Sequence, residues 1–167
     1  VKAEMAKDLA TLYEIEPVDA ESHERTVRNC LAVRRWIEER KLSAMTVNFR
    51  EITEETGLEI MPFMEACKAM ARGTGYAGEG DVLTAALVGA LSTTFDKVNF
   101  TETFCPDWKG NTVMISHMGE MNYNVSDIKP QLNNVAFNYT NAAAPVVGYA
   151  KFRGGKAIYA NVCRDAE

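Results

Sequence analysis

The sequence predicts an α/β fold in which the end of a doubly wound α/β domain is followed by an antiparallel, barrel-like β region. Two observations indicate this order. Apolar residues recur at helical spacing through most of residues 1–96, whereas alternation and turn signals typical of strands follow from Lys97 onward. We therefore expect residues 1–96 to be part of an α/β central domain and residues 97–167 to be the start of a β-rich C-terminal domain.

Composition limits the function classes. The chain has 167 residues, of which 47% are hydrophobic, enough for a buried core. Its 18 Lys and Arg against 23 Asp and Glu give a formal charge of −5, which argues against nucleic-acid binding. No apolar run approaches the ~18–20 residues of a membrane span, and no leader pattern follows Val1. We expect a cytoplasmic protein whose four widely separated cysteines are buried, reduced thiols.

Helical spacing predicts the first elements. Residues 1–14 are expected to form an amphipathic helix, and Pro17 ends the pattern. A second helix over residues 22–41 is capped by Asp19 or Ser22. Its core stripe comprises Val27, Cys30, Leu31, Val33 and Ile37. Its charged face, expected to be solvated surface, comprises Glu24, Arg28, Arg34, Arg35, Glu38 and Glu39.

A strand and two further helices are expected before residue 96. The β-branched segment 44–49 predicts a buried strand. Pro62 is placed to begin a helix that ends near Gly73, and the methionines on its apolar face are expected to lie in the core. Asp81 is expected to cap the next helix, which carries apolar residues at helical spacing from Val82 to Leu91.

The second part of the chain predicts antiparallel strands. Segments 98–104 and 112–118 are expected to be strands joined by a turn. Residues 122–144 are rich in Asn and have no clear period, so no element is predicted there. Segments 146–152 and 156–162 flank Arg153-Gly-Gly155 and predict a hairpin.

Three polar residues are candidates for a functional site: Glu79, Glu102 and His117. Glu79 lies between two glycines just before a predicted helix, where the helix dipole favours an ionised carboxylate. Alternation places Glu102 on the strand face that carries Phe100 and Phe104. His117 ends an apolar run, which is an unusual place for a solvated imidazole.

Each candidate also has a structural explanation. A Gly-Glu-Gly loop is often a turn with a surface acid, a strand glutamate usually faces water, and a single histidine in an apolar strand is commonly a hydrogen-bonded core residue. The residues alone therefore leave open whether they form a metal or acid–base site. A phosphate site is not indicated, because the loop lacks the Lys-Ser/Thr ending of a P-loop and Glu79 would repel an anion.

Four motifs resemble those of the L-arabinose isomerase family in order and at similar spacing. They are Thr46-Val-Asn-Phe49 with Gly57-Leu58 and Met61-Pro62, Gly75-Tyr-Ala-Gly-Glu-Gly-Asp81 with Leu83-Thr-Ala-Ala-Leu87, Phe100-Thr-Glu-Thr-Phe104, and Ile115-Ser-His-Met-Gly-Glu120. The resemblance covers roughly residues 40–125 and is weaker on either side.

The resemblance implies a metal-dependent aldose–ketose sugar isomerase. In that family a divalent ion, usually manganese, is held by two glutamates and two histidines, so Glu79, Glu102 and His117 would be three of the four ligands. The two glutamates would also act as acid and base, moving a proton through an ene-diol, while the metal polarises the sugar oxygens. The implied cofactor is Mn²⁺, and the implied partners are a sugar substrate and further copies of the protein, since family members are oligomers.

The chain departs from the family pattern in two places. No histidine follows His117, although the second ligand histidine of the family lies beyond it. Thr103 and Phe104 stand where the family usually has an acid and a tyrosine, which leaves the sugar open. Family members are also several times longer, so we expect a fragment that is inactive alone. The alternative hypothesis is a non-catalytic sugar-binding or regulatory relative with the same fold, and a fourth ligand histidine in the parent sequence would favour the enzyme.

Overall fold

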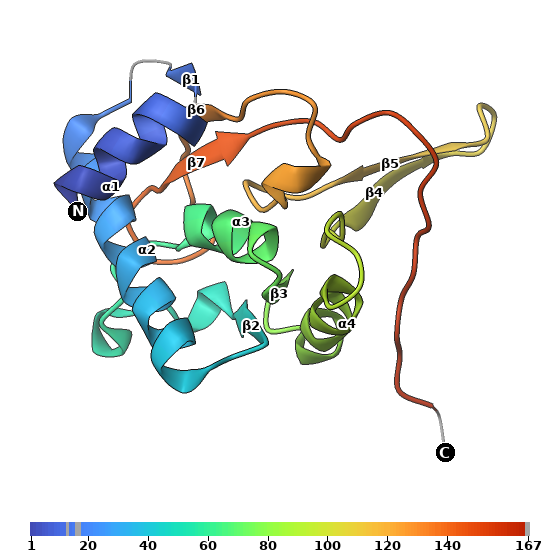
Figure 1. The fold of residues 1–167 in the computed structure, drawn as a ribbon, viewed down its shortest axis with the longest axis horizontal. Helices are drawn as coiled ribbons and strands as arrows, with labels where there is room; N and C mark the ends of the chain where they lie inside the picture. Colours follow the sequence, from blue (N-terminus) through green and yellow to red (C-terminus); the bar gives the residue numbers. More distant parts are fainter. Residues whose placement is uncertain (13, 16–17, 166–167) are drawn as a thin grey trace.

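The computed structural model describes residues 1–12, 14–15 and 18–165, and it is a mixed α/β structure (Figure 1). The helices are α1 (Lys2–Lys7), α2 (Ala20–Arg40), α3 (Phe63–Ala71) and α4 (Val82–Ser92). The strands are β1 (Glu14–Ile15), β2 (Ala44–Val47), β3 (Gly75–Gly78), β4 (Glu102–Asp107), β5 (Thr112–Ser116), β6 (Gln131–Asn134) and β7 (Val146–Tyr149). Short helical turns lie at Asp8–Leu12, Phe49–Glu51, Glu54–Thr56 and Tyr123–Val125.

A parallel pair of strands lies at the centre of the first part. β2 and β3 pair from Ala44 opposite Gly75 to Val47 opposite Gly78, with α3 between them in sequence and α4 directly after β3. Because parallel strands end at the same edge, the residues that follow Val47 and Gly78 lie side by side there. This edge is where the candidate site is found.

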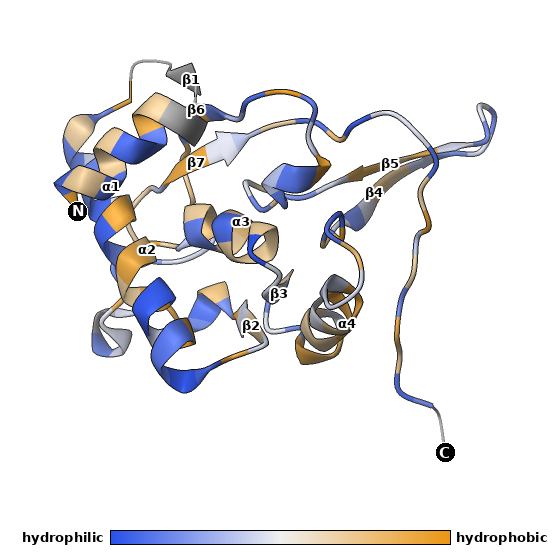
Figure 2. Ribbon diagram, viewed as in Figure 1, coloured by the Kyte–Doolittle hydropathy of each residue, from blue (hydrophilic) through white to orange (hydrophobic). Residues whose placement is uncertain are grey.

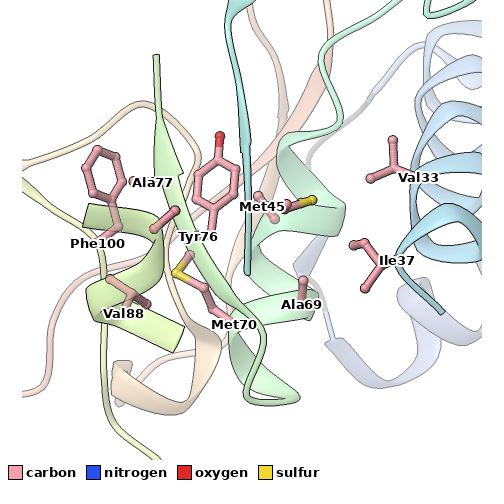
Figure 3. Close-up of a cluster of buried hydrophobic side chains, with 11 residues drawn as sticks. Val33, Ile37, Met45, Ala69, Met70, Tyr76, Ala77, Val88 and Phe100 are labelled. Carbon is pink, nitrogen blue, oxygen red and sulfur yellow. The ribbon is translucent and has the colours of Figure 1, made fainter. Parts of the chain in front are cut away.

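The main core packs around this pair of strands. Val33 and Ile37 of α2, Met70 of α3, Tyr76 of β3 and Val88 of α4 belong to one cluster of buried residues. Figure 3 shows Val88 and Phe100 on one side of β3, with Val33 and Ile37 on the other. Figure 2 shows hydrophobic residues along α3 and α4 and hydrophilic residues on the C-terminal part of α2. None of the described helices is both long and apolar enough to cross a membrane.

Two smaller sheets complete the described strands. β4 and β5 form an antiparallel hairpin whose register shifts between Thr103 and Cys105. β6 lies between β1, to which it is parallel, and β7, to which it is antiparallel. The described strands thus form three separate sheets and no closed barrel. The mixed α/β class is confirmed, whereas the doubly wound and barrel-like parts of the prediction are not, and the domain division at residue 96 stays a prediction.

Local sequence signals located most helices correctly. Asp19 caps α2 by accepting a hydrogen bond from Ser22 N at 2.7 Å, and Asp81 caps α4 by accepting one from Thr84 N at 2.9 Å. The predicted core stripe of α2 is buried at Val27, Cys30, Val33 and Ile37, and the methionines of α3 are in the core. The predicted helix over 1–14 ends earlier, since α1 stops at Lys7 before a π-helical turn, and residues 13 and 17 lie outside the described residues.

Three expectations were wrong. β7 pairs with β6, not with residues 156–162, because Val146 and Leu132 bury their side chains fully against the core while Ile158 remains 94% exposed. The Asn-rich stretch 122–144 therefore contains a strand and a helical turn. Of the four free cysteines, Cys30 and Cys67 are buried as expected, but Cys105 and Cys163 are exposed. Figure 1 shows the C-terminal segment running away from the body of the molecule as an extended trace.

Candidate active-site pocket

A pocket of about 350 Å³ opens where β2 and β3 end beside the β4–β5 hairpin. All three candidate residues, Glu79, Glu102 and His117, line it although they come from three segments of the chain. The other residues that line it are Val47, Phe49, Met61, Phe63, Gly78, Phe104, Met118, Glu120, Phe137 and Tyr139. The pocket therefore has apolar walls and a small set of ionisable groups, as small-molecule sites commonly do.

Glu79 is presented by a tight turn between β3 and α4. Its φ is +59°, a left-handed conformation that is uncommon for a residue with a side chain. The turn is held by Gly80 N, which donates to Thr46 Oγ1 at 3.0 Å, and by Asp81 N, which donates to Gly78 O at 3.0 Å. The turn keeps the Glu79 side chain exposed at the pocket, consistent with a ligand-binding role and not with a core role.

Glu102 and His117 meet because of the register of the hairpin. Glu102 pairs with Ser116, the residue before His117. His117 Nε2 and Glu102 Oε2 are 3.8 Å apart, which is beyond hydrogen-bond distance. The Glu102 side chain is 45% exposed and that of His117 is 11% exposed, so the carboxylate lies at the open side and the imidazole further in.

The imidazole of His117 is packed tightly on one side. Its ring centroid is 4.7 Å from that of Phe100. A Cβ atom added at Gly78 would lie 3.2 Å from His117 Cε1 and 3.3 Å from Phe100 Cε1, closer than ordinary van der Waals contact. The last residue of β3 must therefore be small for the ring to take this place.

Two buried residues behind His117 were missed by the sequence reasoning. Glu120 is 3% exposed, and its Oε2 contacts His117 Nδ1. Its Oε1 accepts a hydrogen bond from the hydroxyl of Tyr76, which is 1% exposed. For Glu120 the sequence did contain a signal: it is a carboxylate three residues after His117, inside the same motif.

Charge in the pocket is predominantly negative. Glu79, Glu102 and Glu120 are accompanied by one imidazole, and no Lys or Arg is among the described residues that line the pocket. Burial alone would lower the pKa of His117, but the contact with Glu120 and the charges of Glu120, Glu102 and Glu79 outweigh it and raise this pKa. Burial, reinforced by Glu120, raises the pKa of Tyr76 well above its usual range. A cation in the pocket would balance these carboxylates.

The donor types suit a divalent cation that prefers oxygen and imidazole ligands, such as Mn²⁺. His117 Nδ1 contacts a carboxylate and leaves Nε2 toward Glu102, the usual arrangement of a metal-binding histidine. In the described part of the chain, no three His, Cys, Asp or Glu side chains are close enough to hold a metal as they stand. The second histidine, His23, is buried on α2 and is not among the residues lining the pocket.

A pocket with apolar walls and a few ionisable groups at the strand ends of an α/β fold is typical of proteins that bind small molecules. The family profile described as the L-arabinose isomerase central domain matches residues 3–97. The chain belongs to the L-arabinose isomerase family, as the motifs indicated.

Curated relatives agree with this assignment. The L-arabinose isomerase of Leuconostoc mesenteroides is 33% identical over 122 residues, covering 68% of this chain and 25% of the relative. The L-arabinose isomerase of Herpetosiphon aurantiacus is 29% identical over 138 residues, covering 79% of this chain and 27% of the relative. The L-arabinose isomerase of Shouchella clausii is 28% identical over 141 residues, covering 82% of this chain and 28% of the relative. The chain thus spans about a quarter of the length of the curated relatives it matches.

Proposed function

We propose that this chain supplies three of the four metal ligands and both proton-transfer groups of a metal-dependent aldose–ketose sugar isomerase. The observation that carries the proposal is that Glu79, Glu102 and His117, from three separate family motifs, line one pocket. Family membership supports sugar isomerisation as the reaction class. A sugar as substrate, assembly with further copies and a cytoplasmic location belong to the same proposal.

The chemistry follows from the residue types. Glu79 and Glu102 would hold the cation through carboxylate oxygens and His117 through Nε2. When bound, a divalent cation polarises the carbonyl and hydroxyl oxygens of the sugar. One glutamate, as the carboxylate, would remove the proton from the carbon beside the carbonyl while the other, as the acid, gives a proton to the carbonyl oxygen, which yields the ene-diol. The first glutamate would then return its proton to the former carbonyl carbon while the second takes the proton of the neighbouring hydroxyl, so that the ketose forms and both glutamates regain their starting states.

The pocket also has aromatic side chains beside the carboxylates and room for the two glutamates to move. Phe104, Phe137 and Tyr139 line the pocket beside the carboxylates and would contact the bound sugar, Phe137 from a buried position and the other two from exposed ones. Glu79 and Glu102 are exposed enough for their side chains to turn toward a shared cation. Family membership implies a fourth ligand, which would come from sequence outside this chain.

The test replaces each glutamate in the full-length protein that carries this chain. Glu79→Gln and Glu102→Gln keep the size of the side chain but remove the base. Turnover of an aldose should therefore fall by ~10²–10⁴-fold or more, with little change in melting temperature. Glu38→Gln, an exposed glutamate on α2, is the matched control and should retain full activity. Turnover above about a tenth of wild type in either pocket variant would contradict the catalytic assignment and favour a sugar-binding relative.

A further inference from the structure

We propose that Glu120 and Tyr76 are positioning residues that fix the ring of His117, so that its Nε2 faces the pocket. This inference rests on the proposed function, in which Nε2 is a metal ligand. Tyr76 is not among the residues lining the pocket. Glu120 does line it, but its side chain is only 1% exposed and its Oε2 contacts His117 at Nδ1, the ring nitrogen away from Glu102. They form a buried series of contacts from Tyr76 through Glu120 to His117.

The geometry of the ring assigns different roles to its two nitrogens. Nδ1 contacts Glu120 Oε2, and neither of these buried atoms forms a hydrogen bond with any described residue, so each is the only polar atom that the other faces. Nε2 is 3.8 Å from Glu102 Oε2 and donates no hydrogen bond to it. An acceptor-only carboxylate against Nδ1 selects the tautomer with its proton on Nδ1, which leaves the lone pair of Nε2 free.

The backbone holds Glu120 in this place. Gly119 has a φ of +68°, and a Cβ added to it would lie 2.9 Å from Val147 Cβ, so the chain can reverse there only with glycine. The buried thiol of Cys67 donates to Gly119 O at 3.1 Å and accepts from Met121 N at 3.2 Å. Both neighbours of Glu120 are thereby tied to α3, which makes its carboxylate a fixed acceptor.

Tyr76, on β3, is the first residue in the series of contacts that leads through Glu120 to His117. Its hydroxyl donates to Glu120 Oε1, the oxygen that does not contact His117, and its ring packs edge-on against Phe100 at 6.1 Å. Phe100 in turn packs against His117, so Phe100 at the ring and the Glu120 carboxylate at Nδ1 together hold the imidazole in place. A carboxylate held at both oxygens cannot turn away from the ring.

The first test measures Mn²⁺ affinity of the full-length protein by electron paramagnetic resonance. Glu120→Gln should weaken Mn²⁺ binding by ~10-fold or more, and Tyr76→Phe, which keeps the ring, should weaken it by a few-fold. The controls Glu38→Gln and Tyr149→Phe change exposed residues and should leave the affinity unchanged. An affinity within about twofold of wild type for Glu120→Gln would overturn the inference, even if the variant melts at a lower temperature.

The second test reads the tautomer directly by ¹⁵N NMR of the metal-free protein, with the pH raised until the ring nitrogen signals stop shifting and the imidazole is neutral. The His117 signal is the one missing from His117→Asn. We expect the Nδ1–H tautomer in wild type and a larger share of Nε2–H in Glu120→Gln; a predominantly Nε2–H ring in wild type would overturn the inference. If Mn²⁺ affinity is unaffected by His117→Asn, the proposed function fails, and the tautomer alone then decides the role of Glu120.

Discussion

Two clusters of charged side chains among the described residues differ in charge balance. The first, here called the helical cluster, joins α1, α2, α3 and the turn after α1. It comprises Glu4, Asp8, Glu65, Arg34, Lys68 and Arg72. The second is the pocket cluster of Glu79, Glu102, Glu120 and His117. In the helical cluster three acids face three bases, whereas the pocket cluster has three acids and one imidazole.

The helical cluster is internally satisfied. Lys68 Nζ is 2.6 Å from Asp8 Oδ1 and 3.0 Å from Glu4 Oε1. Arg34 binds Glu65 at 2.8 Å and Glu4 at 2.7 Å, so it does not lie on the solvated face that the sequence predicted for it. Burial of charge is tolerated here because every charged group has an oppositely charged partner within contact.

The pocket cluster lacks such partners. Its three carboxylates line one cavity, and the described residues lining it contribute no Lys or Arg. Like charges brought together in this way cost free energy unless a cation or proton balances them. Net charge, and not burial alone, therefore distinguishes the helical cluster from the pocket that we propose as a metal site.

The largest expected effect comes from breaking the balance of the helical cluster. Lys68→Met leaves Asp8, which is fully buried, without its cation and should destabilise the protein by ~3–5 kcal/mol. Lys97→Met, at an exposed position, is the control and should change the free energy of unfolding little. Denaturant unfolding with and without Mn²⁺ checks the result; a loss seen only with Mn²⁺ would show that the helical cluster serves metal binding.

A smaller effect is expected in the pocket cluster, and it should depend on metal. His117→Asn keeps a donor for Glu120 but loses the Nε2 ligand, so Mn²⁺ affinity should fall by ~10-fold or more, about 1.4 kcal/mol, with an unchanged metal-free melting temperature. His23→Asn, at the buried histidine on α2, should lower the melting temperature equally with and without Mn²⁺. Equal destabilisation of His117→Asn in both conditions, by ~1–3 kcal/mol, would make His117 a core residue.

Local signals in the sequence predicted the helices well and the pairing of segments less well. Asp19 and Asp81 each accept a hydrogen bond from a backbone N–H three residues later, so their capping roles could be recognised from the local sequence. β3 has no β-branched residue, and the sequence predicted no strand there. Pairing with β2 and burial on both faces stabilise it. The strand partner of β7 lay in an Asn-rich segment that has no periodic pattern.

The candidate site could be predicted at the residues that carry a recognisable motif, and less well at those that only support them. Glu79, Glu102 and His117 were identified from their segments and line one pocket. Glu120 was missed because a fully buried glutamate is rare and its partner Tyr76 lies 44 residues earlier. Arg34 was misplaced for a similar reason, since its partner Glu65 lies on another helix.

The smallest expected effect is a pH dependence that originates in the helical cluster. Burial alone would raise the pKa of Glu4, but hydrogen bonds and charges from Arg34 and Lys68 outweigh it and lower this pKa to about 2. Below its ordinary pKa of 4.5 the unfolded chain takes up a proton at Glu4, whereas the folded chain does so only near pH 2. The stabilisation from Glu4 is therefore complete above about pH 4.5 and is lost as the pH falls toward 2.

Glu4→Gln isolates this contribution, because the variant has no proton to take up at that position. Asp8 lies in the same cluster with a pKa that burial raises, against the opposing effect of Lys68, so its pH dependence has the opposite sign. The charge of Glu4 adds to this rise, so Asp8 titrates in both proteins with a smaller upward shift of its pKa in Glu4→Gln. Melting curves between about pH 6 and 2 should show wild type losing its advantage over Glu4→Gln as the pH falls. If the difference in stability between the two proteins is constant over this range, the carboxylate of Glu4 is not paired in solution. Glu4 would then not belong to the helical cluster, whose acids and bases would no longer balance.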